Sequence, residues 1–336
     1  MPQKINGKDI SVVLQGPIYK STTEKCLASL RKHLPECEII LSTWDNSDIE
    51  NLDYDIVVLS QDPGSTRMLI NNDKLKYNIN RQIISTQAGL AKVTRKYVLK
   101  FRTDFILKSS KFLNYMYLFP HRIEKWKITE ERIIMPMGTQ PYWMVFHPTD
   151  VLCFGLTQDV KNYWSCKLPS KEFSEWFLNK PLPLSAAVDL CMKIGAEPYI
   201  WSELLRKYQH KFGAINFKHS WDNSNENIEL SKITLANNTI MLDRDQFEFE
   251  TPEHPYLFNP EYDYTWINHD LWKLYYIKFC KPYDSKYQIY YDKYNDICKR
   301  QSIDMRKRNK KVIMRALKNK FKSFKKKIRK VLFIKR

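Results

Sequence analysis

The sequence predicts an α/β protein built on a doubly wound sheet. Over the first hundred residues, short aliphatic runs alternate with helical periodicity in the order strand, helix, strand, strand, helix, strand. The connections are short, as is usual in compact α/β units. With 336 residues and 43% hydrophobic residues, the chain is long enough to bury one large core or two ordinary ones.

The first half of the chain supplies clear strand and helix signals. The β-branched run 10–14 (ISVVL) is closed by Gln15-Gly16-Pro17, which predicts a strand and a turn. Thr22 or Thr23 is a suitable cap for a helix that stops at Pro35. The further expected elements are strands at 38–42, 55–59 and 97–101 and a helix at 78–93.

The second half carries weaker signals. We expect strands at 133–136, 151–154 and 239–242, and helices at 158–164, 184–193 and 198–208. Residues 251–282 are dense in Tyr, Trp, Phe and Pro, which predicts an aromatic lining or packing layer. The chain is therefore divided into a catalytic domain (1–250), an aromatic-rich helical extension (251–304) and a basic amphipathic helix (305–336).

The net charge of +18 is a property of the C-terminal tail. Residues 305–336 hold 16 Lys and Arg and no acidic residue; subtracting them from 55 leaves 39 basic against 37 acidic residues. The body is thus close to neutral, and we expect no nucleic-acid partner. Within the tail, apolar residues recur at steps of three and four: Ile313, Leu317, Phe321, Phe324, Ile328 and Val331. A basic helix with such a face predicts binding to an anionic membrane surface.

The cysteine pattern and the absence of apolar segments favour a cytoplasmic protein. The seven cysteines are scattered, without a CxxC pair, which argues against a disulfide framework or structural zinc. The N-terminus lacks an apolar signal segment, and no apolar run approaches the ~20 residues of a membrane-spanning helix. We expect a peripheral position on the inner face of the cell membrane.

Polar residues follow each of the four predicted strands of the first half: Gln15, Asp45, Asp62 and Asp104. In open α/β sheets, ligands bind outside the carboxyl ends of the strands. The turns contain neither a G-x-G-x-x-G nor a P-loop pattern, which argues against a dinucleotide enzyme and an NTPase. An ion pair between Arg102 and Asp104 at a strand end is about as plausible from this segment alone as a site.

An ordered set of segments resembles the WavE lipopolysaccharide-synthesis family. They are ISVVLQGPI, EIILSTWDNSD, DPG, NINRQIIST, YVLKFRTD, FHPTDVLCFG and EPYIWSELLRKY, spread over roughly the first two-thirds of the chain. The resemblance implies a GT-A-like fold, a Rossmann-like mixed sheet between helices. It also implies a glycosyltransferase that uses a nucleotide-diphospho-sugar to build lipopolysaccharide or capsule glycan.

The family pattern transfers to positions of this sequence. The resemblance implies donor-binding roles for Gln15, Gly16, Pro17, Asp45, Asn80, Arg81 and Arg102, and Asp62 joins them as a strand-end carboxylate. Asp104 ends the Arg-Thr-Asp segment, which resembles an Asp-x-Asp metal site with Arg102 at its first position. His147 and Asp150 match an H-x-x-D-like segment. Glu197 keeps the family's glutamate, although its flanking prolines differ.

Glycosyl transfer requires that the leaving diphosphate be neutralised and the acceptor hydroxyl deprotonated. Mg²⁺ or Mn²⁺ on Asp104 would serve the first need, with Arg81 or Arg102 on the phosphates. Glu197, Asp150 and His147 are the candidates for the base. Local alternatives stand beside each role: an Asx-turn for Asp45, a surface ion pair for Arg81, a loop hydrogen bond for His147 and helix-dipole stabilisation for Glu197.

Two other functions fit parts of the sequence. A sugar nucleotidyltransferase shares the α/β architecture but usually has a Gly-rich basic loop after its first strand, which Gln15-Gly16-Pro17 matches poorly. A non-catalytic membrane-bound or polyanion-binding protein would explain the tail and predicts a body without a ligand. A lipid-linked glycan acceptor at the membrane surface fits the transferase and the tail together.

Overall fold

The computed structural model describes residues 4–70, 73–137, 145–170, 195–218, 222, 224–254, 267–300, 303 and 314. Over 66–70 and 73–76 it describes the backbone. The expected helix at 184–193, the tail over most of 305–336 and part of the aromatic segment lie outside these ranges.

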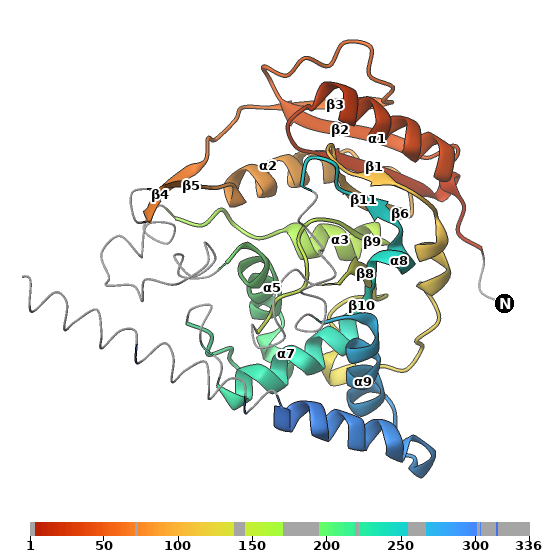
Figure 1. Cartoon of the computed structure of the whole chain (residues 1–336), viewed down its shortest axis with the longest axis vertical. Coiled ribbons are helices and arrows are strands. Elements are labelled where there is room, and N and C mark those ends of the chain that lie inside the picture. The colour runs from red at the N-terminus through yellow and green to blue at the C-terminus, as the bar shows by residue number, and fades with distance from the viewer. Residues whose placement is uncertain are drawn as a thin grey trace, which may run out of the picture.

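A seven-stranded mixed sheet forms the centre of the molecule (Figure 1), with strand order β10-β8-β9-β6-β1-β2-β3. Only β9 runs antiparallel to its neighbours in this sheet. The strands are β1 (Ile10–Gln15), β2 (Glu38–Trp44), β3 (Ile56–Ser60), β6 (Tyr97–Arg102), β8 (Ile133–Pro136), β9 (Cys153–Leu156) and β10 (Thr239–Leu242). Every residue of β1 is buried, as expected for a strand with both faces covered. The predicted α/β class is confirmed.

Helices cover both faces of the sheet. They are α1 (Lys20–His33), α2 (Ile79–Leu90), α3 (Thr157–Trp164), α5 (Ala196–Lys207), α6 (Gln209–Phe212), α7 (Asn225–Asn238), α8 (Arg244–Phe247) and α9 (His269–Cys280). The crossovers β1-α1-β2 and β3-α2-β6 advance in opposite directions across the sheet, so right-handed connections place α1 and α2 on opposite faces. At Gly89, a Cβ atom would lie 2.5 Å from Val13 Cγ1, so α2 packs very closely on β1.

Two small ribbons stand outside the main sheet. β4 (Thr66–Ile70) and β5 (Asp73–Tyr77) form an antiparallel pair that the sequence did not indicate. β7 (Ile106–Leu107) pairs antiparallel with β11 (Phe249–Glu250), although the two lie far apart in the chain. This second ribbon brings the segment after β11 to the carboxyl end of β6.

A C-terminal helical extension packs at the β10 edge of the sheet (Figure 1). α9 contacts α7 and β10, and His269 Nδ1 lies 2.7 Å from the Met241 carbonyl oxygen. Its aromatic residues Trp272, Tyr275 and Tyr276 are buried, so this part of the aromatic segment is a packing layer. Residues 288–300 continue as a helix. In the described part of the chain, no helix combines the length and the apolar character that crossing a lipid bilayer would require.

Element boundaries differ slightly from those predicted. α1 begins at Lys20, before both expected threonine caps, and Tyr19 is its N-cap residue. Thr23 Oγ1 instead accepts a hydrogen bond from the Tyr19 amide at 3.0 Å. α2 ends at Leu90, three residues early, and β2 runs on to Trp44. None of the six described cysteines forms a disulfide with another described cysteine; Cys191 lies outside the described residues.

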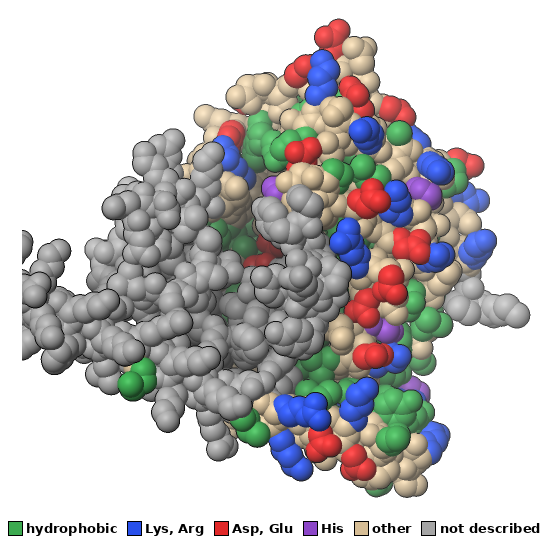
Figure 2. Space-filling model, viewed as in Figure 1, with side chains coloured by type: hydrophobic (Ala, Val, Ile, Leu, Met, Phe, Trp, Pro, Cys, Tyr) green, Lys and Arg blue, Asp and Glu red, His purple; other side chains and the backbone are tan. Residues whose placement is uncertain are grey.

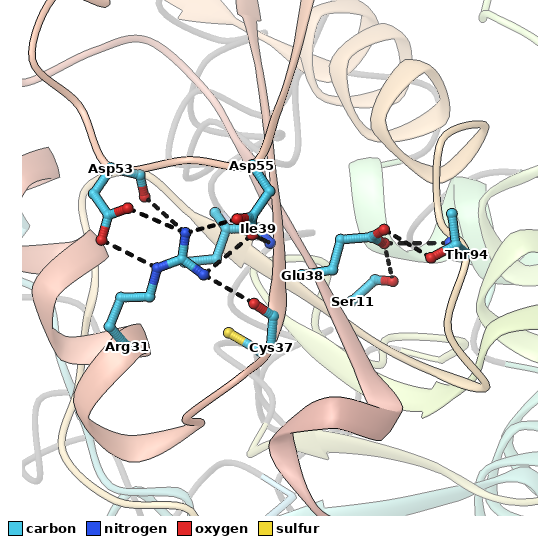
Figure 3. Close-up of polar contacts among 8 residues, drawn as sticks. All are labelled: Ser11, Arg31, Cys37, Glu38, Ile39, Asp53, Asp55 and Thr94. Atoms are coloured by element: carbon cyan, nitrogen blue, oxygen red, sulfur yellow. Dashed lines mark hydrogen bonds and ion pairs between the residues drawn. The ribbon is translucent and has the colours of Figure 1, made fainter.

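Arg31 joins α1 to the start of β3 (Figure 3). Its guanidinium donates to both carboxylate oxygens of Asp53, at 3.1 and 3.2 Å, and of Asp55, at 3.1 Å each. It also donates to the Cys37 carbonyl at 2.9 Å, and Asp55 accepts from the Ile39 amide at 2.7 Å. These contacts fix the amino ends of β2 and β3. They leave the carboxyl ends of the strands, at the opposite end of the sheet, available for a site.

Candidate active site

A cavity of about 560 Å³ opens at the carboxyl ends of β1, β2 and β6, within the size range of small-molecule sites. Figure 2 shows a hollow at the centre of this face with acidic side chains at its bottom. Nine of the twelve residues predicted for the site line the cavity: Gln15, Gly16, Pro17, Asp62, Arg81, Arg102, Asp104, Asp150 and Glu197. The lining thus brings residues from 15 to 197 into one site.

Asp104 is held at the end of β6 by a two-pronged ion pair. Arg102 Nε donates to Asp104 Oδ1 at 2.8 Å and Arg102 Nη2 donates to Oδ2 at 2.6 Å. His254 Nε2 lies 3.2 Å from Asp104 Oδ2. The Asp104 side chain is only 1% exposed, while that of Arg102 is 24% exposed. The guanidinium therefore fixes the carboxylate and still reaches the cavity.

A second arginine–carboxylate pair, Arg81 with Asp62, also lines the cavity. Arg81 Nε donates to Asp62 Oδ1 at 2.7 Å, and Nη2 donates to Oδ2 at 2.5 Å. Hydrogen bonding from Arg81 lowers the pKa of Asp62; burial opposes this shift, and the Gly64 amide adds to the lowering. Both partners are about 30% exposed, so a ligand anion can approach the guanidinium.

The loop after β1 is shaped by close backbone contacts. Gly16 has φ of +128°, and a Cβ there would lie 2.9 Å from Thr103 Oγ1. Thr103 Oγ1 donates to the Pro17 carbonyl at 2.6 Å, which ties this loop to the Arg-Thr-Asp segment. Gln15 is buried, and its Oε1 accepts from Ser85 Oγ of α2 at 2.8 Å. Only glycine combines this backbone angle with this packing at position 16.

The candidates for the base occupy different environments. Asp150 and Glu197 line the cavity, Glu197 from the first turn of α5. Burial raises the pKa of Asp150, against the opposing effects of Lys100 and Arg102. His147 lies beneath the lining, 2% exposed, with Nε2 at 3.6 Å from Glu197 Oε2. Burial lowers the pKa of His147 to about 3, which makes its imidazole a weak proton acceptor.

Three predicted residues do not line the cavity. Asp45 is exposed, in the turn that follows β2. Asn80 lies on α2, and its buried Oδ1 has no hydrogen-bond partner among the residues that the structure describes. His147 is covered, as described above. The position of a polar residue at the end of a strand was therefore not enough to predict whether its side chain lines the cavity.

The cavity is also lined by residues to which the sequence analysis assigned no role in the site. Tyr19 and Trp44 supply aromatic surface, and Gln82 and Ser85 supply polar groups from α2. His254 arrives through the β7–β11 pairing, four residues after β11. No local pattern around His254 marks it, because its proximity to Asp104 depends on that distant strand pairing.

The arginines of the described lining are fewer than its carboxylates. Two arginines face four carboxylates, and each arginine is paired with one of them. A diphosphate would therefore need further positive charge in this cavity. No cluster of three or more His, Cys, Asp or Glu with metal-binding geometry occurs in the described ranges. Asp104 and His254 converge, however, and a magnesium-type ion commonly takes one or two protein ligands plus phosphate oxygens.

Comparisons with known proteins give one family. The sequence model of the family described as WavE lipopolysaccharide synthesis matches residues 10–306. No curated protein matches the chain significantly. Among solved structures, the crystal structure of the glycosyltransferase GlyE from Streptococcus pneumoniae TIGR4 is similar over 63% of this chain and 46% of that chain, at 13% identity and a TM-score of 0.31. The match thus spans less than half of GlyE, and a likeness of this size carries no conclusion about activity.

Proposed function

Because this chain belongs to the WavE lipopolysaccharide synthesis family, we propose that it is a glycosyltransferase acting on a nucleotide-diphospho-sugar donor. Its product would be a growing lipopolysaccharide or capsule glycan. The observation that carries the proposal is the cavity at the carboxyl ends of β1, β2 and β6, which places two arginines, aromatic rings and four carboxyl groups around one space.

The donor would lie along the β1 and β6 ends. Arg102 lines the cavity and engages Asp104 through Nε and Nη2, so its Nη1 would be the atom that donates to a phosphate oxygen. Arg81 offers a second guanidinium from α2. The rings of Tyr19 and Trp44 provide flat surfaces against which a nucleobase can stack.

A divalent metal fits this site. Asp104 Oδ1 accepts a single hydrogen bond among the described residues, so it retains a lone pair for Mg²⁺ or Mn²⁺, and His254 is the second protein group that would hold the ion. When bound, the ion would neutralise charge on the leaving diphosphate. The excess of carboxylates over arginines in the lining supports this requirement.

Asp150 is the base that we favour, ahead of Glu197. In an inverting transfer the base takes the proton of the acceptor hydroxyl while the hydroxyl oxygen bonds to the anomeric carbon. The bond from that carbon to the diphosphate breaks, and the nucleotide leaves with the electron pair. A carboxylate whose pKa is raised by burial accepts a proton more readily, which supports Asp150.

We propose that the C-terminal tail holds the enzyme at an anionic membrane surface, close to a lipid-linked acceptor. The tail lies mostly outside the described residues, so this rests on its sequence: 16 basic residues and an apolar stripe. Peripheral attachment would raise the local concentration of a lipid-linked acceptor.

A ligand panel tests the donor class. Purified protein is mixed with UDP, GDP and CMP and their sugar conjugates, with and without Mn²⁺, and its melting temperature is measured. A ligand that binds only the folded state must raise that temperature. We expect a shift with one nucleotide diphosphate and slow hydrolysis of the matching sugar donor. Absence of any shift and of any hydrolysis across the panel would contradict the proposal.

A further inference from the structure

The segment 146–151 keeps a strained conformation because several elements hold it. Phe146 is fully buried at φ +57°, a backbone region that bulky residues rarely adopt. Its amide donates to Ser231 Oγ of α7 at 2.8 Å. The hydroxyl of Tyr163 on α3 donates to the Thr149 carbonyl at 3.4 Å. Such strain persists only where the surroundings over-determine it, and it concentrates at functional sites.

Lys100 is the buried charge beneath this segment. It lies in β6, paired with Val13 on one side and Cys153 on the other, and is 0% exposed. Its Nζ donates to the carbonyls of Asp150 at 2.6 Å and Val151 at 3.0 Å. The ammonium also lies 4.7 Å from the centre of the Trp164 ring.

A lysine at this position is a poor choice for stability. Burying an ammonium costs several kcal/mol, and although the negative charge of Asp150 opposes this penalty, Lys100 makes its hydrogen bonds to two neutral carbonyls and to no carboxylate among the described residues. An aliphatic residue would fit the strand pattern Tyr97–Arg102 better. The contacts of Lys100 point to the Asp150 segment as the reason for the charge.

We infer that Lys100 is a positioning residue that grips the backbone of Asp150 and so directs the Asp150 carboxylate into the cavity. The inference rests on the proposed function, in which Asp150 deprotonates the acceptor. Gln82 Nε2 of α2 donates to the same Asp150 carbonyl at 3.3 Å, so that carbonyl is held from two elements. The cavity wall at Asp150 is thereby fixed by side chains from both β6 and α2.

Lys100 also affects the charge state of Asp150. The titratable or charged groups that act on this pair come from β6, the turn after it, β9 and α3: Arg102, Asp104, Cys153 and Tyr163. Burial raises the pKa of Asp150, and the Lys100 ammonium is the first of the groups that oppose the rise. Removing the ammonium therefore lets the pKa of Asp150 rise further. As the pH is lowered, the carboxylate of the variant is protonated earlier than that of the wild type, so a reaction that needs the ionised carboxylate begins to lose rate at a higher pH.

Hydrogen–deuterium exchange tests the positioning without any substrate. In full-length Lys100→Met, we expect amides in peptides over 146–153 to exchange on the order of tenfold faster, since they lose the grip of two hydrogen bonds. Peptides over 10–15 should be unchanged. Lys92→Met, which removes an exposed lysine, is the matched control. Unchanged exchange over 146–153, or equal acceleration in every peptide, would overturn the inference.

Kinetics test the link to chemistry. Lys100→Met should lower kcat on the order of 10²-fold with the donor KM kept, and should move the acidic limb of the pH profile upward. Lys100→Gln keeps a hydrogen-bond donor without the charge. It should therefore show the same pH shift as Lys100→Met, with a smaller increase in amide exchange over 146–153. It also replaces Lys100→Met in the test if that variant does not fold. Wild-type kcat and an unmoved limb in both variants would refute the positioning role. If the wild type transfers no sugar at all, the proposed function fails, while the exchange experiment still decides the role of Lys100.

Discussion

Replacing Asp104 by Asn is the sharpest test of the site, because the change removes a charge and keeps the size. In the wild type, the carboxylate accepts two hydrogen bonds from Arg102, at 2.8 and 2.6 Å, and lies 3.2 Å from His254. An amide has one acceptor oxygen, so one arginine hydrogen bond is kept and the other meets an N–H group. The charge that would face a metal disappears.

The expected loss of stability follows from these contacts. One charge-assisted hydrogen bond contributes about 1.5–3 kcal/mol, and an unpaired buried partner raises the cost toward about 5 kcal/mol. The Arg102 side chain is 24% exposed, so solvent compensates part of the loss and the lower figure applies. Against a typical stability of ~5–15 kcal/mol, the protein stays folded; with an unfolding entropy of ~2.1 cal/mol/K per residue over 336 residues, its melting temperature falls by about 2–4 °C.

The assay measures initial transfer rate, melting temperature and nucleotide-induced melting shift for wild type and Asp104→Asn. We expect a folded variant without detectable transfer and with a smaller Mn²⁺-dependent shift. Asp292→Asn, the same change at an exposed position far along the chain, is the control and should match the wild type. Near wild-type transfer by Asp104→Asn would refute the role of Asp104. If EDTA leaves wild-type transfer unchanged, the proposed role of a metal at Asp104 is wrong, and the arginines alone must neutralise the diphosphate.

Three further predictions address the base, the tail and the helix packing. Asp150→Asn should lower kcat by ~10²–10⁴-fold with donor binding kept, and a comparable fall in Glu197→Gln with an active Asp150→Asn would move the base to Glu197. Deleting residues 305–336 should release the protein from anionic vesicles in flotation assays and leave the α/β core folded; in the full chain, binding should weaken steeply with salt because each basic residue contributes ~1 kcal/mol before screening. Flotation of the truncated protein equal to that of the full chain would show that the tail is not the anchor. Gly89→Ala should lower the free energy of unfolding by ~1–3 kcal/mol, because its Cβ would lie 2.5 Å from Val13 Cγ1 and this overpacking outweighs the better helix propensity of Ala; an unchanged or higher melting temperature would contradict the close packing of α2 on β1.

The hydrophobic periodicity of the first hundred residues was enough to predict the four strands that this part of the chain adds to the main sheet, the two helices between them and their order in the chain. Runs such as ISVVL and EIILS are buried on both faces, and such strands keep their identity in almost any α/β context. Turn residues and short connections then restrict the topology to a few right-handed arrangements. The β4–β5 pair was missed because its segment, TRMLI to DKLKY, carries no strong turn signal.

The sequence by itself determined the α/β class, the strand-end position of Gln15, Asp62 and Asp104, and the separation of a near-neutral body from a basic tail. These depend on local composition and periodicity, which neighbouring residues carry. Only the tertiary structure decided that His254 lies beside Asp104, that Asp45 lies outside the cavity, and that Lys100 grips the Asp150 carbonyl. Each of these depends on the pairing of segments distant in the chain, such as β7 with β11 and β6 with β9, and on the direction in which a side chain leaves its strand. Local pattern specifies the elements, and burial of the shared core specifies which of their ends meet.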